Sequence, residues 1–214
     1  MNKKEFVFRY YRLFNNLPFN NHIKGTINIH NSGSILRKCH IISTGKNNSI
    51  ILPHNCYFNR CEFIFLGDNN TIQFGPNCLA KNASFHIEDS NNSIIVGCNT
   101  TFCGQAHLAA IEGTRIVIGD DCLFSSDIVF RTGDSHSIID SEGNRINPSE
   151  DIVIKNHVWI GHRVLINKGV LISSNSIIGT GAIVTKKFNE KNVVLVGIPA
   201  RIAKTNINWD SKRL

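Results

Sequence analysis

The chain has 214 residues, with 23 Lys and Arg against 16 Asp and Glu, which gives a formal net charge of +7. Hydrophobic residues make up 42% of the sequence and charged residues 18%, a composition that supports a packed core and excludes wholesale disorder. No stretch approaches the roughly 18 uninterrupted apolar residues of a transmembrane helix. The first residues, MNKKEFVFRYYRLF, contain neither a clean apolar run nor a small-residue cleavage site. We therefore expect no signal peptide and a cytoplasmic location.

Residues 1–25 are expected to form an N-terminal helical cap. Apolar residues there follow helical spacing and stop before Pro18, which would end the helix: Phe6, Tyr10, Leu13, Phe14 and Leu17. The helix is expected to cover the open edge of the first strands. The alternative is peripheral association with a membrane surface through the same amphipathic helix.

A repeat of 22 residues follows. Four segments align (NNSIILPHNC, NNTIQFGPNC, NNSIIVGCNT and GTRIVIGDDC), and their first isoleucines are Ile50, Ile72, Ile94 and Ile116. Asn, Asp and Gly gather just before each of these isoleucines, and such residues tolerate the left-handed backbone angles of tight corners. The alternating residues after each corner predict a short strand.

After residue 150 the spacing tightens to six residues. Large aliphatic residues recur without a slip at Ile154, Ile160, Ile166, Ile172, Ile178 and Val184. A second row precedes them by two positions, at Ile152, Val158, Val164, Val170, Ser176 and Ala182. A period of six suits short strands that turn a corner and point one aliphatic side chain into a shared core, which is the hexapeptide β-helix pattern.

The predicted fold is therefore all-β: a parallel β-helix of hexapeptide repeats with an N-terminal helix, one protruding loop and a C-terminal tail. The β-helix is expected over 26–187 and the tail over 188–214. From Ile116 to Ile152 is 36 residues, 14 more than one repeat, so a loop over 131–150 is expected to leave the coils.

Seven cysteines occur, and none forms a CxxC pair, so a structural zinc site is not expected. Cys56, Cys78 and Cys122 fall at matching positions of the repeat. We expect buried thiols in a reducing compartment and no catalytic cysteine.

Three motifs carry a resemblance that covers residues 27–201. They are GDSHSI in the loop, NHVWIG at the start of the six-residue period, and GIPAR at residues 197–201. With them the chain resembles the hexapeptide-repeat acetyltransferase family, and the run RINPSEDIVIKNHVWIG and the tail INW look most like capsular polysaccharide and sialic-acid O-acetyltransferases. The resemblance implies a left-handed coil, acetyl-CoA as co-substrate without a metal, and a homotrimer with active sites between subunits. It also implies acetyl transfer to a hydroxyl of a bacterial surface glycan that is anionic.

His136 is the expected general base, because a hydroxyl that attacks a thioester must lose its proton and a neutral imidazole can accept it. A polar loop on a rigid scaffold is where reactive groups tend to lie, and the resemblance places the family's catalytic histidine at this position. Asp134 is expected either to orient the imidazole or to shape a turn. No activated nucleophile is evident, so direct attack in a ternary complex is expected.

Trp159 should point outward from its strand, and the resemblance implies that it lines the acetyl and pantetheine pocket beside the catalytic histidine; interface packing alone is the alternative. The resemblance also carries over a group of residues that would bind coenzyme A: Gly179, Thr180, Gly181, Ala182, Lys186, Lys187 and Arg201. For the two lysines, a merely solvated surface is an equal alternative.

Other readings stay open at this point. A γ-type zinc carbonic anhydrase would use His157 and His162, but the neighbouring coil offers no third histidine. A polyanion-binding scaffold without activity is compatible with the positive charge, and so is transfer to an amine of a nucleotide sugar or a xenobiotic. Nucleic-acid binding is disfavoured because no dense basic run or basic patch with aromatic residues appears beyond the N-terminus.

Overall fold

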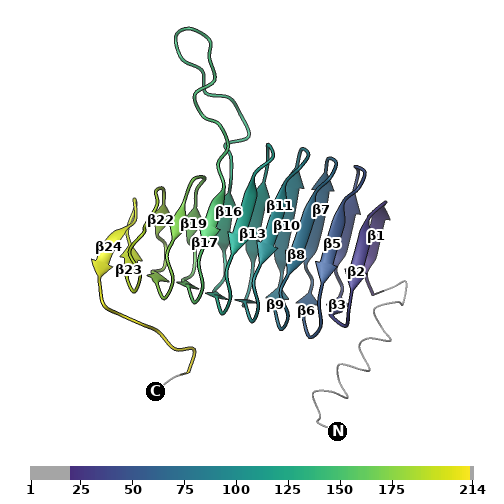
Figure 1. The fold of residues 1–214 in the computed structure, drawn as a ribbon, viewed down its shortest axis with the longest axis horizontal. Coiled ribbons are helices and arrows are strands. Elements are labelled where there is room, and N and C mark those ends of the chain that lie inside the picture. Colours follow the sequence, from purple (N-terminus) through teal and green to yellow (C-terminus); the bar gives the residue numbers. More distant parts are fainter. Residues whose placement is uncertain (1–19, 213–214) are drawn as a thin grey trace.

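Residues 20–212, which are described by a computed structural model, form short strands in three sheets around one core (Figure 1). Within these residues there is no helix, and every strand pair but one is parallel. The predicted all-β parallel β-helix is therefore confirmed.

The strands fall into the three sheets as follows. Sheet A contains β1 (His22–Gly25), β4 (His40–Ser43), β7 (Glu62–Leu66), β10 (Ala83–Glu88), β13 (Ala106–Ala110), β16 (Ile128–Arg131), β19 (Leu165–Ile166) and β22 (Ile183–Val184). Sheet B contains β2 (Asn28–Asn31), β5 (Ser49–Leu52), β8 (Thr71–Phe74), β11 (Ser93–Val96), β14 (Arg115–Ile118), β17 (Ile152–Ile154) and β20 (Leu171–Ile172). Sheet C contains β3 (Ile35–Arg37), β6 (Tyr57–Asn59), β9 (Leu79–Lys81), β12 (Thr101–Phe102), β15 (Leu123–Phe124), β18 (Trp159–Ile160), β21 (Ile177–Ile178), β23 (Val194–Val196) and β24 (Arg201–Lys204).

Each turn of the coil visits the three sheets in the order A, B, C. Strands three apart in the chain are neighbours in a sheet, so β1 to β21 make seven turns within the described residues. The aligned isoleucines of the 22-residue repeat lie in register, as Ile72 with Ile94 and Ile94 with Ile116. Backbone N–H and C=O groups are thereby paired from coil to coil across the strand spacing of about 4.8 Å.

Asparagines form a ladder inside the corner that leads into sheet B. Asn48, Asn70 and Asn92 are buried, and the side-chain oxygen of each accepts a hydrogen bond from the backbone N–H one coil later, at 2.8–2.9 Å. The residue before each of them has positive φ, for example 58° at Asn69. The Asn-rich segments are therefore corners, as predicted, and their amides satisfy backbone groups that would otherwise be buried without a partner.

The core inside the first coils is filled by phenylalanine. Phe85 contacts Phe63 in a stacked arrangement at 5.3 Å and meets Phe74 and Phe102 edge to face at 5.1 and 5.7 Å. All four rings are buried. Aromatic rings suit the wide early coils because they bury much apolar area in favourable edge-to-face geometry.

The later coils are narrower. Both six-residue rows are buried, from Ile152 to Val184, as predicted. The strand of sheet A has six residues in β10 and two in β19 and β22. The longer repeat thus places extra residues in sheet A, whereas the six-residue period uses the shortest strand that turns a corner.

The coil stack extends beyond the limits expected from the sequence. It begins at His22 rather than residue 26, and β23 still pairs in parallel with β21, so the stack continues to Val196 rather than ending at 187. The helix expected near the N-terminus, and with it the membrane-surface alternative, lies in residues 1–19, outside the described range. Within residues 20–212 no helix could span a membrane.

The cysteines are unpaired, and most are buried. Cys56, Cys78 and Cys122 face the core as expected, and burial raises the pKa of the Cys122 thiol to about 12. Cys103 is exposed and Cys98 half-buried, because both lie at corners rather than at inward positions of a strand. The expectation of buried thiols therefore does not extend to these two.

We predict that Phe85→Ala destabilises the protein by about 3–5 kcal/mol, because the cavity left among the rings cannot collapse in a core closed on three sides. Urea unfolding followed by circular dichroism measures this change. Leu66→Ala, at an exposed position of β7, is the matched control and should cost less than about 0.5 kcal/mol. Equal losses for the two variants would contradict this account of the core.

Candidate active site

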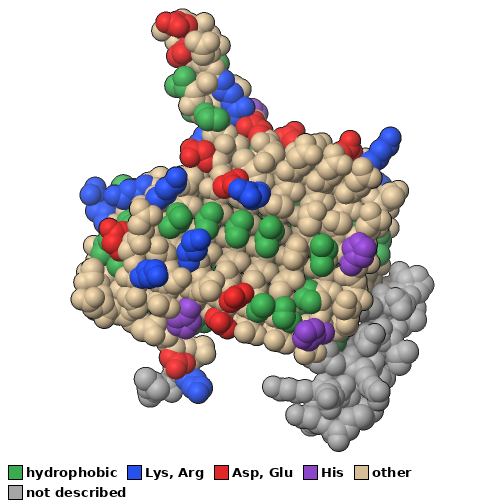
Figure 2. All heavy atoms as spheres, in the orientation of Figure 1, with side chains coloured by type: hydrophobic (Ala, Val, Ile, Leu, Met, Phe, Trp, Pro, Cys, Tyr) green, Lys and Arg blue, Asp and Glu red, His purple; other side chains and the backbone are tan. Residues whose placement is uncertain are grey.

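The chain between β16 and β17 leaves the coil at the corner between sheets A and B and projects beyond it (Figure 1). Its outer part is a small hairpin. The N–H of Ile146 donates to the carbonyl of Ile138 at 2.8 Å, and the N–H of Asp140 donates to the carbonyl of Asn144 at 2.9 Å. This is the loop expected over 131–150, and Figure 2 shows it standing clear of the coils.

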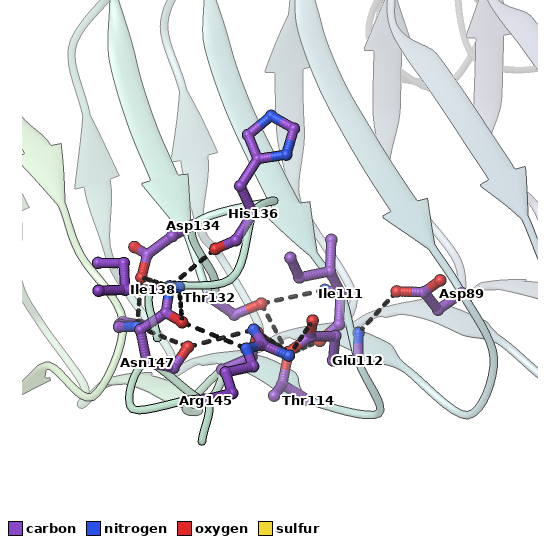
Figure 3. Close-up of polar contacts among 12 residues, drawn as sticks. Asp89, Ile111, Glu112, Thr114, Thr132, Asp134, His136, Ile138, Arg145 and Asn147 are labelled. Atoms are coloured by element: carbon purple, nitrogen blue, oxygen red, sulfur yellow. Dashed lines mark hydrogen bonds and ion pairs between the residues drawn. The ribbon is translucent and has the colours of Figure 1, made fainter. Parts of the chain in front are cut away.

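Asn147 holds the two sides of the loop together where they leave the coil (Figure 3). Its side chain is buried, and its Nδ2 donates to the carbonyl of His136 at 2.8 Å and to the carboxylate of Asp134 at 2.9 Å. Its Oδ1 accepts from the N–H of Ile138 at 2.7 Å and from Nε of Arg145 at 3.2 Å. One amide thus ties both sides of the loop, and it fixes the backbone at His136.

Asp134 is anchored to the coil rather than to the imidazole. Its carboxylate accepts from Nζ of Lys168 at 2.5 Å and from Asn147. The lysine ammonium and the amide hold the pKa of Asp134 below its usual value. The structure therefore does not support the expectation that Asp134 orients His136 directly; its contacts instead brace the loop.

A second ion pair braces the other side of the loop. The guanidinium of Arg145 donates to both carboxylate oxygens of Glu112, at 2.8 and 2.9 Å, and the hydroxyl of Ser149 donates to the same carboxylate at 2.7 Å. Arg145 and Ser149 lower the pKa of Glu112. Glu112 lies just after β13, one coil before the loop, so the pair joins the loop to the rigid stack.

His136 is exposed, and its imidazole points away from this polar network (Figure 3). Within residues 20–212 its ring has no hydrogen-bond partner; only its backbone carbonyl is engaged, by Asn147. A fixed backbone with an unengaged imidazole is what a general base needs, because the ring nitrogen must be available to a substrate proton.

Trp159 lies on sheet C, with 39% of its surface exposed, and points outward as expected. Two residues that the sequence analysis did not assign to the site flank this region. The indole of Trp209 stacks on the imidazole of His157, with ring centroids 4.3 Å apart and planes at 6°, and its centroid is 6.1 Å from that of Trp159. The INW motif at residues 207–209 was the only signal for Trp209, and no spacing rule connects it to Trp159.

The residues expected to bind coenzyme A do not all gather at one place. Gly179, Thr180 and Gly181 form the corner between sheets C and A that follows β21, close to Trp159, whose strand partner is Ile177. Arg201 begins β24 at the edge of sheet C. By contrast, Lys186 and Lys187 follow β22 and are exposed at the corner between sheets A and B.

Ala182 differs from the other residues of the expected coenzyme A group. Its side chain is fully buried in the core, so it cannot line an outer surface. Its place in the inward six-residue row explains the difference. Gly179 is required for packing between coils, because a Cβ there would lie 2.8 Å from Cγ1 of Val196.

The two histidines weighed as zinc ligands have separate partners. Nε2 of His157 is 3.1 Å from the carbonyl oxygen of Trp209, whereas Nδ1 of His162 is 2.9 Å from the hydroxyl of Ser126. No group of three or more potential metal ligands is found within the described part of the chain.

Comparison with known proteins shows similarity to acetyltransferases. It is similar to the polysialic acid O-acetyltransferase of Escherichia coli O1:K1 / APEC, at 34% identity over 51% of this chain and 36% of the relative. It is also similar to the galactoside O-acetyltransferase of Escherichia coli K12, at 37% identity over 48% of this chain and 50% of the relative. The aligned part thus spans half or less of these two relatives, and no protein-family profile matches the chain.

The fold comparison covers more of the molecule. The crystal structure of the polySia-specific acetyltransferase NeuO superposes with a TM-score of 0.80 at 29% identity, over 90% of this chain and 88% of that one. The chain is thus similar to hexapeptide-repeat β-helix acetyltransferases, in fold over nearly its whole length and in sequence over about half of it. In this chain, the structure separates two groups of expected site residues: the loop with His136 at the corner between sheets A and B, and Trp159 with the glycine corner and Arg201 on the side of sheet C.

We predict that Asn147→Ala loosens the loop without unfolding the coils. Amide hydrogen exchange of residues 134–147 should accelerate about tenfold, because loss of one well-placed buried amide costs about 1–3 kcal/mol locally. Asn144→Ala, at the tip of the same loop, is the matched control and should leave exchange at the loop base unchanged. The same acceleration at the loop base in both variants would show that Asn147 has no special part in bracing the loop.

Proposed function

We propose that the protein transfers an acetyl group from acetyl-CoA to a hydroxyl of a bacterial surface glycan, with His136 as the general base. The proposal rests on the contacts and exposure of His136. Its backbone is held by Asn147 on a braced loop, while its imidazole is exposed and without a hydrogen-bond partner in the described chain. The similarity to acetyltransferases of polysialic acid and of galactosides supports the same chemistry.

The proposed reaction begins with proton transfer to the imidazole of His136. A ring nitrogen of His136 accepts the proton of the acceptor hydroxyl as its oxygen attacks the thioester carbonyl carbon. The tetrahedral intermediate then collapses, the carbon–sulfur bond breaks, and the proton held by the imidazole passes to the departing thiolate of CoA. Three further residues act indirectly, because they fix the loop that carries the imidazole: Asn147, Asp134 and Lys168.

The acceptor is proposed to be a capsular polysaccharide, with sialic-acid-containing polymers as the first class to test. The relatives include enzymes named for polysialic acid and for galactosides, and the net charge of +7 suits an anionic polymer. Acetyl-CoA is the proposed co-substrate, without a metal, and the cytoplasm is the proposed location, which agrees with seven unpaired cysteines. We also propose the left-handed coil of the family.

The assembly is proposed to be a homotrimer with active sites between subunits. Within one chain, His136 and Trp159 lie on different sides of the stack, at the A/B corner and on sheet C, so a site that uses both needs a second subunit. The loop also exposes apolar side chains below its tip, with Ile138 55%, Ile139 63% and Ile146 58% exposed. Docking on a neighbouring subunit would cover them.

Sheet B offers one surface for such contacts. Figure 2 shows a row of hydrophobic side chains that crosses the coils on the visible side. The outward residues of neighbouring strands of sheet B form such a row: Ile95, Val117, Val153 and Leu171. They are half-buried in the single chain.

We predict that His136→Ala lowers kcat by about 10²–10⁴ while the oligomer stays folded, because the base is lost and the loop contacts are made by the backbone carbonyl. Acetyl-CoA consumption with polysialic acid as acceptor measures the rate, and size-exclusion chromatography checks the assembly. His30→Ala, at an exposed position of β2, is the matched control. Turnover near that of the wild type would refute the assigned base.

A second prediction concerns the shared site. In a random one-to-one mixture of His136→Ala and Trp159→Ala subunits, co-expressed and purified together, about a quarter of the sites in a cyclic trimer should regain both residues. Activity should recover to a similar fraction of the wild type. Mixing His136→Ala with the double variant is the control and should restore nothing. If the first mixture stays as inactive as its parents, both residues act within one chain; an active Trp159→Ala parent would show that Trp159 is dispensable.

A further inference from the structure

We propose that Trp209 is a positioning residue that holds the indole of Trp159 in place, so that the C-terminal segment around INW forms part of the active site. The inference rests on the proposed function, because it assumes that Trp159 lines the acetyl and pantetheine pocket. It is carried by three sets of contacts at the end of the chain.

The first set of contacts fixes the C-terminal segment just before Trp209. After β24 the chain turns back along the coil, and Ile207 is fixed from both sides of its peptide. Its N–H donates to the carbonyl of Asn192 at 3.0 Å, and its carbonyl accepts from Nδ2 of Asn192 at 2.9 Å. Asn192 has φ of 59° at a corner before β23, so the anchor belongs to the coil stack.

The second set fixes Trp209 itself on His157. The two rings are nearly parallel, and two hydrogen bonds close the pair: Nε1 of Trp209 donates to the carbonyl of His157 at 3.0 Å, and Nε2 of His157 meets the carbonyl of Trp209 at 3.1 Å. Because a carbonyl only accepts, Nε2 of His157 carries a proton in this arrangement. His157 in turn is joined to the preceding coil, since its N–H donates to the carbonyl of Asp120 at 2.8 Å.

The third set brings this pair against Trp159. His157 precedes Trp159 by two residues at the start of β18, and the indole of Trp209 is tilted by 46° to that of Trp159, with centroids 6.1 Å apart. Leu123 and Ile177, the residues in register with Trp159 on the neighbouring strands, are aliphatic. Trp209 is therefore the aromatic side chain that limits how far the outward indole can rotate.

The same segment borders open space. A cleft of about 550 Å³ lies between the C-terminal segment and strands β12 and β15, and Thr101, Leu123, His157 and Trp209 line it. Trp209 is thus a wall of a cleft next to Trp159, and it is not wholly packed into the core. A substrate held at Trp159 would meet an indole with one orientation, which saves the cost of ordering that ring on binding.

The test uses the fact that the chain has only two tryptophans. Trp209→Phe and Trp209→Ala each leave Trp159 as the sole tryptophan of the full-length protein, so its fluorescence reports its surroundings directly. Trp209→Phe keeps a ring beside Trp159, whereas Trp209→Ala removes it. Asp210→Ala is the control for the segment, because among residues 20–212 the Asp210 carboxylate has one hydrogen bond, from the N–H of Lys212.

We expect acrylamide to quench Trp159 about twofold more strongly in Trp209→Ala than in Trp209→Phe, and CoA binding to reduce that difference. With acetyl-CoA and polysialic acid, kcat/KM should fall about tenfold in Trp209→Ala, chiefly through kcat, and stay within about threefold of the wild type in Trp209→Phe. Asp210→Ala should match the wild type.

Equal quenching of Trp159 in the Phe and Ala variants would overturn the proposal, and so would equal values of kcat/KM. If the wild-type protein proves inactive with these substrates, the proposed function fails. The comparison of quenching still decides whether Trp209 positions Trp159.

Discussion

The structure depends on hydrogen bonding from coil to coil. Each backbone group of a strand pairs with the strand one turn later, so the position of a residue in the repeat decides its sheet and its side of the stack. The buried asparagine ladder supports this pairing at the corners, and the phenylalanine core fills the space between the sheets. A scaffold of this kind leaves little freedom within the coils, so a residue can leave its repeat position only where the chain departs from the repeat.

Within residues 20–212, two segments depart from the repeat and carry the proposed site. The loop after β16 carries His136, and a network of Asn147, Asp134, Lys168, Arg145 and Glu112 joins it to the coils. The segment after β24 carries Trp209 back to His157. Because the first departure is at the corner of sheets A and B and the second lies over sheet C, a single chain holds the two parts of the proposed site apart. Association of subunits is then the step that would assemble a complete site.

Much of the fold could be predicted from the sequence because the repeat is periodic. The six-residue rows from Ile152 to Val184 identified the inward positions, and the 36-residue interval between Ile116 and Ile152 located the loop. The same rows should have excluded Ala182 from the surface, since it stands in the inward row. Periodicity predicts which side of a strand a residue occupies. It gives no information about contacts made by segments that lie outside the repeat.

The contacts within the candidate site were harder to predict for that reason. Asp134 lies two residues before His136, and this closeness in sequence suggested a direct contact; the carboxylate instead reaches Lys168, 34 residues later. Trp209 meets His157 across 52 residues. Such pairs depend on how a loop or a terminal segment folds back on the coils, and neither composition nor spacing encodes that path.

The central claim is that the proposed catalytic base and Trp159 meet only between two subunits. A crystal structure of the full-length protein with bound CoA tests it most directly. The account predicts that the CoA sulfur lies between the imidazole of His136 from one subunit and the indole of Trp159 from its neighbour. A CoA sulfur flanked by His136 and Trp159 of the same chain, or a His136 imidazole far from every CoA molecule in the assembly, would contradict it.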